Sequence, residues 1–268
     1  MSYEVTVEPT GDVIEVEEGQ TILDAALRQG VWLPFACGHG TCATCKVQVL
    51  EGEGDLGNAS PFALMDMERE EGKVLACCCT PESDMVIEAD IDVDDDFMGY
   101  AVQDFIGTVT EIKDLSPTIK GIMFELDKDI EFQAGQYINL FVTIDGVETA
   151  RPYAISSSPS QRDYYDLTVK RVEDGFVTPY LLDHVETGQQ LLSTGPMGTF
   201  YHNPVFHGKE LVFLAGGSGI APAMSMLTDV LERDLPYKFH FIYASSYVDD
   251  VIFVQSLRAL AEKHDNFK

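Results

Sequence analysis

The sequence predicts a multidomain protein of mixed α+β and α/β class. Three observations lead to this prediction: a cysteine-rich stretch after one short helix, a middle region of many short strands, and a final region in which strands and helices alternate. At 268 residues the chain is long enough for two or three domains with separate cores. We therefore expect domains at residues 1–96, 100–205 and 206–268.

The chain is strongly acidic. It holds 17 Lys and Arg residues against 45 Asp and Glu residues, a formal net charge of −28. A nucleic-acid binder needs a basic surface, so that class of protein is excluded. The charge suits a protein that associates with a basic partner, although solubility alone would also account for it.

Neither a membrane span nor a signal peptide is expected. No segment approaches 18 consecutive apolar residues, and the N-terminus has neither a basic nor an apolar region. We therefore expect a cytoplasmic protein. Three of its six cysteines are adjacent, which favours metal or cluster ligation over a disulfide framework.

The first region combines short strands with one helix. Thr21 is placed to cap an amphipathic helix at Ile22–Gln29, and Gly30 would end it. Residues 31–45 are too rich in Gly, Cys and Thr for regular structure, and the acidic run at 92–96 is expected to be a solvated linker. The predicted strands are Tyr3–Val7, Val13–Val16, Lys46–Leu50 and Met85–Ile91.

The cysteine spacing is the strongest signal in the sequence. Cys37, Cys42 and Cys45 form C-x4-C-x2-C, and further cysteines follow about thirty residues later. This is the arrangement of a plant-type [2Fe–2S] cluster, whose two irons need four soft thiolates. A zinc site would usually pair C-x2-C with a second C-x2-C or with two His residues.

Three consecutive cysteines compete to be the fourth ligand. Cys77 follows the apolar approach Lys73–Ala76, as the last ligand of ferredoxins does, and we favour it. Cys78 and Cys79 would then be small packed residues. His39 lacks the second Cys-x-His pair of a Rieske site, so we expect it to be a loop residue.

The middle and final regions predict two further architectures. The strands Phe105–Ile112, Gly121–Leu126, Gln136–Thr143, Ala150–Ser156 and Tyr164–Val172, with one helix at Thr178–His184, predict an antiparallel barrel. Strands at Glu210–Ala215 and Lys238–Ala244 each precede a helix, the second at Asp249–Lys263, and predict the first part of a doubly wound parallel sheet. Two strands do not make a stable parallel sheet. We therefore expect this domain either to be incomplete at its C-terminus or to be stabilised by packing against another structure.

The whole chain resembles the ferredoxin–NAD(P) reductase superfamily in its ferredoxin-first arrangement. It is especially similar to the reductase components of bacterial multicomponent oxygenases, those of phenol hydroxylases above all. The similarity is carried by Gln20–Leu23 through Cys45–Val47 and by Ala59–Leu64. It implies a β-grasp ferredoxin, an antiparallel flavin-binding β-barrel and a doubly wound nucleotide-binding domain.

Two stretches of the middle region resemble the flavin motifs of that family. The first, an Arg-x-Tyr-Ser/Thr motif, is Arg151-Pro152-Tyr153-Ala154. The resemblance implies that Arg151 neutralises the flavin pyrophosphate and that Tyr153 lies against the ring. Ala154 replaces the usual hydroxyl donor near flavin N5, although its backbone N–H can still donate.

The second flavin motif opens the short helix. A Gly-x-x-Ser/Thr turn at a helix start offers N–H groups and the positive end of the helix dipole to phosphates. Lys170 and Val172 resemble the family's segment beside the ring, so FAD is expected rather than FMN. The motif is Gly175-Phe176-Val177-Thr178.

A glycine-rich turn between a strand and a helix is the context of a nucleotide loop. Gly216, Gly217 and Gly219 would let a pyrophosphate approach the backbone. After the next strand no Arg is present to clamp a 2′-phosphate, and Asp249 and Asp250 would repel one. NADH is therefore expected rather than NADPH.

These sites predict an NADH-dependent iron–sulfur flavoprotein reductase. Electrons would pass from NADH to FAD, to the cluster and then to a partner oxygenase. No side chain is needed as a catalytic acid or base, because the protein orients the rings and excludes water. Two alternatives stay open: the same chemistry serving a dioxygenase or an anaerobic system, and a non-enzymatic electron-transfer subunit of a larger redox complex.

Overall fold

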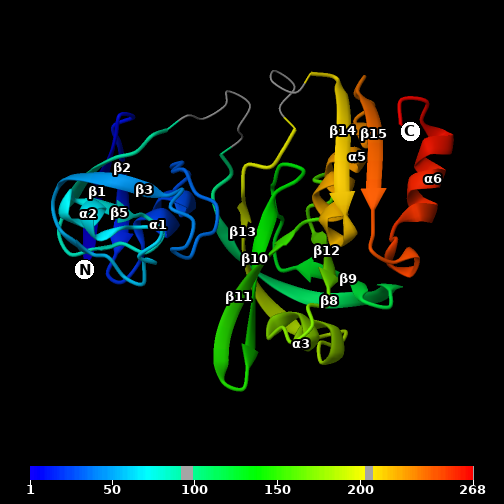
Figure 1. Cartoon of the computed structure of the whole chain (residues 1–268), viewed down its shortest axis with the longest axis horizontal. Helices are drawn as coiled ribbons and strands as arrows, with labels where there is room; N and C mark the ends of the chain where they lie inside the picture. Colours follow the sequence, from blue (N-terminus) through cyan, green and yellow to red (C-terminus); the bar gives the residue numbers. More distant parts are fainter. Residues whose placement is uncertain (92–98, 203–207, 268) are drawn as a thin grey trace. The chain divides into compact units, whose positions relative to one another are not determined.

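The computed structural model describes residues 1–91, 99–202 and 208–267, and the chain divides into two compact units, Met1–Val102 and Gln103–Lys268 (Figure 1). The predicted linker at 92–96 lies outside the described residues. No described helix is long and apolar enough to span a membrane.

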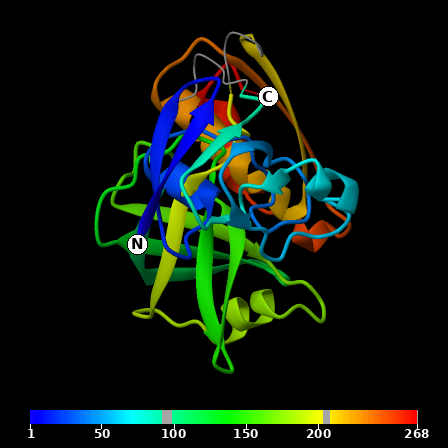
Figure 2. The same ribbon diagram turned by 90° about the vertical axis from the view of Figure 1, so that its left-hand side faces the viewer.

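The first unit is built on a five-stranded sheet in the order β2-β1-β7-β3-β5. Its first two strands form an antiparallel hairpin, seen in dark blue in Figure 2, and β1 pairs with β7 in parallel. Alternate side chains of the hairpin, such as Val5 and Ile14, are fully buried. The strands are β1 (Ser2–Glu8), β2 (Asp12–Glu17), β3 (Lys46–Glu51), β5 (Lys73–Leu75) and β7 (Met85–Glu88).

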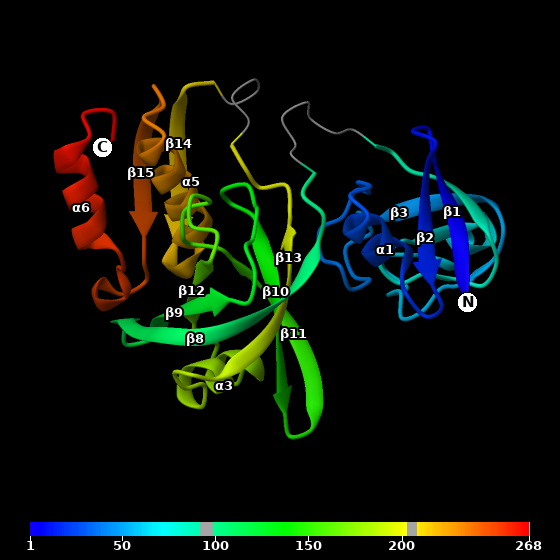
Figure 3. The same cartoon turned by 180° about the vertical axis from the view of Figure 1, so that it is seen from behind.

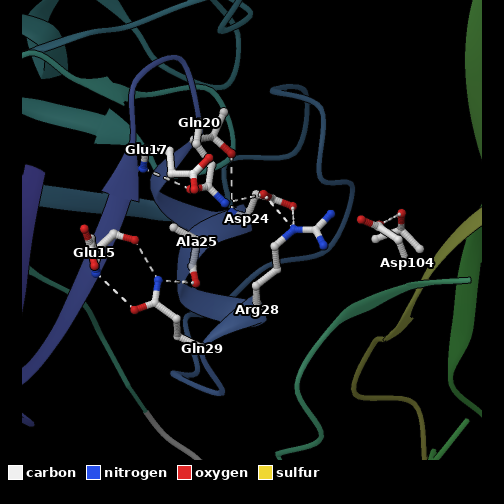
Figure 4. Close-up of polar contacts among 10 residues, drawn as sticks. Glu15, Glu17, Gln20, Asp24, Ala25, Arg28, Gln29 and Asp104 are labelled. Carbon is white, nitrogen blue, oxygen red and sulfur yellow. Dashed lines mark hydrogen bonds and ion pairs between the residues drawn. The ribbon is translucent and has the colours of Figure 1, made fainter. Parts of the chain in front are cut away.

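Helix α1 (Ile22–Arg28) forms where the sequence predicts it. The side chain of Thr21 accepts a hydrogen bond from the N–H of Asp24, and the chain leaves the helix at Gly30 with φ +75°. Figure 4 shows Gln29 at its end, whose Nε2 donates to the carbonyl of Glu15 (2.7 Å) on β2. This contact ties the C-terminal end of α1 to β2.

Four short elements in this unit were not predicted. They are β4 (Gly54–Asp55), α2 (Asp66–Glu70), β5 (Lys73–Leu75) and β6 (Thr80–Pro81). Each has five residues or fewer, which is too short for hydrophobic periodicity to mark it.

The second unit opens with a six-stranded antiparallel sheet in the order β11-β10-β13-β8-β9-β12. Its two edge strands meet at an antiparallel bridge between Ile155 and Leu167, around a core that includes Phe105, Phe124 and Tyr165. Strand β13 was not predicted from the sequence. The elements are β8 (Gln103–Ser116), β9 (Ile119–Leu126), β10 (Tyr137–Ile144), β11 (Val147–Ala154), β12 (Tyr164–Lys170), α3 (Val177–Asp183) and β13 (Gln190–Met197).

The final region adds a parallel ladder of β14 (Glu210–Gly216) and β15 (Lys238–Ala244), with α5 (Ala221–Glu232) and α6 (Val254–Lys263) packed beside it (Figure 3). Phe267 continues the pattern through an isolated parallel bridge to Phe239. The predicted helix Asp249–Lys263 is wrong in its first part. The 3-10 turn η2 (Val248–Asp250) comes first, and Phe253, with φ +60°, separates it from α6.

Candidate functional site

The cysteine-rich loop points backbone N–H groups at sulfur. The N–H groups of His39 and Thr41 donate to Sγ of Cys37 (3.5 and 3.4 Å), and the N–H of Cys37 donates to Sγ of Cys42 (3.4 Å). Positive φ values at Gly38 (+70°) and in two other loop residues, Gly40 and Ala43, turn the chain back on itself. Such a loop suits thiolate ligands.

The hydrogen bonds on Cys37 favour its ionised form. Burial raises the pKa of this thiol, but the hydrogen bonds from His39 and Thr41 outweigh burial and bring the pKa down to about 6. His39 is held within the loop, since Nδ1 lies 2.6 Å from the carbonyl of Cys37 and Nε2 lies 3.2 Å from Oγ1 of Thr41. The imidazole ring of His39 therefore stabilises the conformation of the loop.

Strand pairing brings Cys45 beside Cys77. Lys46 of β3 is the partner of Leu75 of β5, and the N–H of Ala76 donates to the carbonyl of Cys45 (2.9 Å). A hydrogen bond from Cys77 lowers the pKa of Cys45 to about 7 against the effect of burial, and the same bond raises the pKa of Cys77. The two predicted ligands thus meet across a sheet ladder.

The neighbouring cysteines lie in different surroundings. Sγ of Cys78 is 3.7 Å from Sγ of Cys77 and packs under Gly40, where a Cβ would lie 2.7 Å from it. Cys79 is fully buried against Gly54, and burial raises the pKa of its thiol to about 12. Cys79 is therefore a packed core residue.

The donor set fits a two-iron cluster. In the described ranges, no three or more His, Cys, Asp or Glu side chains converge to hold a single metal ion. A [2Fe–2S] cluster does not require that convergence. Each of its two irons would bind only two of the four thiolates, and sulfide completes the coordination.

Closure of the sheet in the second unit sets the end of the first flavin motif beside β12, the strand that precedes the second motif. Arg151, Pro152, Tyr153 and Ala154 end β11, directly before the bridge residue Ile155. The partner of that bridge lies on β12, which ends at Lys170. Residues on opposite edges of the sheet therefore become neighbours.

Two side chains on β11 fit a bound flavin. The hydroxyl of Tyr153 is buried without a hydrogen-bond partner among the described residues, and burial raises its pKa to about 12. Arg151 is exposed, and its Nη1 contacts only Oγ1 of Thr149 and the carbonyl of Ala150. Across the described chain, no carboxylate forms an ion pair with this guanidinium, so it is available to a phosphate.

The predicted phosphate turn is tight. The N–H of Gly175 donates to the carbonyl of Val172 (3.1 Å), and a Cβ on Gly175 would lie 2.9 Å from that oxygen. Thr178 turns its hydroxyl back to accept from the N–H of Val172 (2.9 Å). No side chain caps α3, which begins at Val177 and has seven residues.

The glycine loop is open on the side where a nucleotide would approach. Gly216 and Gly219 are exposed, and a Cβ at either would meet no atom within 4 Å. At Gly217 a Cβ would lie 3.4 Å from Nζ of Lys170. Lys170 thus joins the predicted flavin strand to the predicted nucleotide loop.

An unpredicted carboxylate anchors this junction. Asp250 is 3 % exposed, and its Oδ1 accepts hydrogen bonds from the hydroxyls of Ser116 (2.7 Å) and Thr118 (2.8 Å). Its Oδ2 lies 3.6 Å from Nζ of Lys170. Asp250 is therefore engaged with the antiparallel sheet, and only Asp249 is exposed as expected for a residue that would repel a 2′-phosphate.

Known families match three stretches of the chain. Residues 5–82 match the 2Fe-2S iron-sulfur cluster binding domain, residues 107–202 the oxidoreductase FAD-binding domain, and residues 213–268 the oxidoreductase NAD-binding domain.

Individual relatives match the chain over its whole length. The phenol hydroxylase P5 protein of Acinetobacter pittii (strain PHEA-2) is 53 % identical over 268 residues, which are 100 % of this chain and 75 % of the relative. The phenol 2-monooxygenase reductase component DmpP of Pseudomonas sp. (strain CF600) is 51 % identical, with coverage of 100 % and 75 %. The crystal structure of the Amycolatopsis reductase GcoB superposes with a TM-score of 0.89 at 32 % identity, covering 99 % of this chain and 79 % of that one.

Proposed function

This chain belongs to the family of oxygenase reductase components in which a 2Fe-2S domain precedes FAD-binding and NAD-binding oxidoreductase domains, and on that premise we propose that its acceptor is a phenol hydroxylase-like oxygenase. The fold is ferredoxin-reductase-like. The chain is an NADH-dependent oxidoreductase, and its cofactors are a [2Fe–2S] cluster, FAD and NAD(H). The choice of oxygenase is supported by the names of the two relatives above 50 % identity.

The cofactors define the direction of electron flow. When bound, FAD would supply two-electron oxidation of NADH and one-electron reduction of the cluster, and the cluster would supply single electrons for the oxygenase. The protein's own part is to orient the rings, to keep water out and to neutralise phosphate charge.

Four cysteines are proposed to hold the cluster: Cys37, Cys42, Cys45 and Cys77. The pairing of β3 with β5 supports Cys77, because it sets this thiol beside Cys45. Arg151 is proposed to bind the FAD pyrophosphate, Tyr153 to contact the ring, and Ala154 to donate its N–H.

The remaining cofactor contacts are assigned by segment. Gly175, Val177 and Thr178 are proposed to contact the FAD phosphates and Lys170 and Val172 to lie near the ring, while Gly216, Gly217 and Gly219 receive the NADH pyrophosphate. The closeness of Lys170 to Gly217 supports this assignment, because it brings the predicted flavin strand within contact distance of the predicted nucleotide loop.

We also propose three domains, at residues 1–96, 100–205 and 206–268, with a β-grasp fold, an antiparallel flavin barrel and part of a doubly wound sheet. The matched ranges 5–82, 107–202 and 213–268 fall inside these limits. A cytoplasmic location completes the proposal, supported by three consecutive cysteines, none of which is paired in a disulfide.

Anaerobic addition of NADH to the purified protein tests the function. Bleaching of the flavin absorbance, followed by the electron paramagnetic resonance signal of a reduced [2Fe–2S] cluster, is expected. Bound flavin that NADH does not bleach would instead favour a non-enzymatic electron-transfer subunit. Turnover with a phenol hydroxylase oxygenase, compared with a ring-hydroxylating dioxygenase, tests the acceptor.

A further inference from the structure

An aromatic side chain stands in solvent on a well-anchored segment of the first unit. Phe62 is 95 % exposed, although the next two residues, Ala63 and Leu64, are buried. The N–H groups of both donate to the carbonyl of Ser60 (2.9 Å each). The backbone on either side of Phe62 is therefore held in place, and the ring faces solvent from a fixed position.

This segment lies against the cysteine-rich loop. The N–H of Ser60 donates to the carbonyl of Gly40 (2.9 Å), between Cys37 and Cys42. A Cβ on Gly40 would lie 3.3 Å from the carbonyl oxygen of Asn58 and 3.4 Å from Cα of Ala59. Phe62 thus follows directly on residues that touch the proposed cluster site.

Two methionines close to Phe62 in the sequence are exposed as well. Met65 is 50 % exposed and Met67 is 64 % exposed, and we call these two residues and Phe62 the apolar patch. Single exposed apolar residues are common, but a group of them marks a binding surface more often. Methionine and aromatic residues are enriched at protein–protein interfaces, and methionine adapts to an irregular partner.

The charges around the apolar patch are unbalanced. The three basic side chains of this part of the unit are engaged: Lys46 with Glu68 (2.5 Å), Lys73 with Glu71 (2.9 Å), and Arg69 with the carbonyls of Leu64 and Ala59. Among described residues, four carboxylates of the same stretch of chain, residues 53–70, form no ion pair with a basic group: Glu53, Asp55, Asp66 and Glu70. The surroundings of the patch therefore carry net negative charge.

We propose that the apolar patch is the docking surface for the protein that accepts electrons from the cluster, through an apolar pocket bordered by Lys and Arg. This inference rests on the proposed function, which supplies an electron-accepting protein. A second copy of the chain would bring like charges together, and an anionic membrane would be repelled in the same way. A basic protein partner gains both from burial of Phe62 and from the charges around it.

Equilibrium binding to the oxygenase component of a phenol hydroxylase tests the proposal. The full chain, loaded with cluster and FAD, would be titrated by calorimetry as wild type and as Phe62→Ala. We expect the Kd to rise by about tenfold or more in Phe62→Ala, in the range of an interface hot spot. The double variant Asp66→Asn/Glu70→Gln should bind more weakly at low salt and show a shallower dependence of Kd on salt.

Matched controls lie on β2, the edge strand at the other end of the sheet from β5. Val13 is 56 % exposed, so Val13→Ala removes a comparable exposed apolar side chain and should leave the Kd unchanged. Glu15→Gln/Glu17→Gln removes two exposed carboxylates there and should leave the salt dependence unchanged. An unaltered visible spectrum of the cluster would show that each variant is folded.

The outcomes separate the two proposals. Unchanged affinity in Phe62→Ala, an equal loss in Val13→Ala, or no binding by the wild-type chain overturns the docking surface. NADH-driven reduction of ferricyanide, a small acceptor that needs no docking, should be the same in all variants. If the wild-type chain fails in that assay while Phe62→Ala still weakens binding, the reductase function is wrong and the docking surface stands.

Discussion

Cys77, Cys78 and Cys79 are adjacent in sequence but differ in what their thiols contact. Cys77 meets Cys45 across the β3–β5 ladder, Cys78 packs under Gly40, and Cys79 is fully buried. We predict that Cys78→Ser retains a cluster with the wild-type electron paramagnetic resonance spectrum, whereas Cys77→Ser loses the cluster or shifts its g values. Loss of the cluster in Cys78→Ser with retention in Cys77→Ser would exchange the roles of these two residues.

Two glycines of the cluster loop have similar φ angles but different neighbours. Gly38 (φ +70°) has no atom within 4 Å of a built Cβ, whereas Gly40 (φ +81°) has Sγ of Cys78 at 2.7 Å. Alanine at Gly38 adds only backbone strain, and alanine at Gly40 adds a steric clash. We therefore expect Gly40→Ala to reduce bound iron much more than Gly38→Ala, as measured by iron content and visible absorbance. Equal losses would contradict this account of the loop.

The guanidinium of Arg151 is free for a phosphate, whereas that of Arg162 already pairs with Glu131. A charge-assisted hydrogen bond contributes about 1.5–3 kcal/mol, so Arg151→Ala should raise the Kd for FAD about ten- to a hundredfold. Fluorescence titration of the apoprotein measures this, with Arg162→Ala as the control. A similar Kd in both variants would remove Arg151 from the flavin site.

At the scale of elements, η2 is tied to the β8–β9 hairpin by one buried carboxylate. Hydrogen bonds from Ser116 and Thr118, with a smaller effect of Lys170, lower the pKa of Asp250. A carboxyl group with a lower pKa in the folded than in the unfolded chain stabilises the fold above its unfolded pKa of about 3.9. That stabilisation is lost as the pH falls through the folded value.

Asp250→Asn should therefore unfold at a lower temperature than the wild type at pH 7, and the two curves should converge in acid. Exposed Asp249 provides the control, since Asp249→Asn should change the Tm little. Circular dichroism melts at a series of pH values provide the measurement. A difference between Asp250→Asn and wild type that persists unchanged below the folded pKa would contradict the linkage.

Sequence patterns predict the elements that are stabilised by residues close together in the sequence. The helix after Thr21 and the strand Lys238–Ala244 follow from a cap and from apolar runs, and the C-x4-C-x2-C spacing marks the cluster loop. The anchor between Asp250 and Ser116 joins residues 134 positions apart, so no local pattern marks it. The break before α6 depends on a left-handed Phe253, a conformation that the residue type does not favour.

At the scale of the molecule, the boundary between the two units falls at Val102 and Gln103. Each unit has its own buried core, and all four proposed cluster ligands lie in the first unit. Residues 1–102 expressed alone should therefore fold and assemble the cluster, and residues 103–268 should bind FAD. Iron and flavin content report the result. A first unit that stays unfolded or without iron would show that its core is insufficient.

The order in which the strands are synthesised differs from their order in the sheet. β7 is the last strand of the first unit to leave the ribosome, yet it lies between β1 and β3 at the centre of the sheet. The sheet can close only after residue 88 has emerged, when Cys37, Cys42, Cys45 and Cys77 have all been translated. Until the sheet closes, the thiol of Cys45, which is buried in the folded unit, stays accessible to iron and sulfide, whereas Cys42 remains exposed after closure.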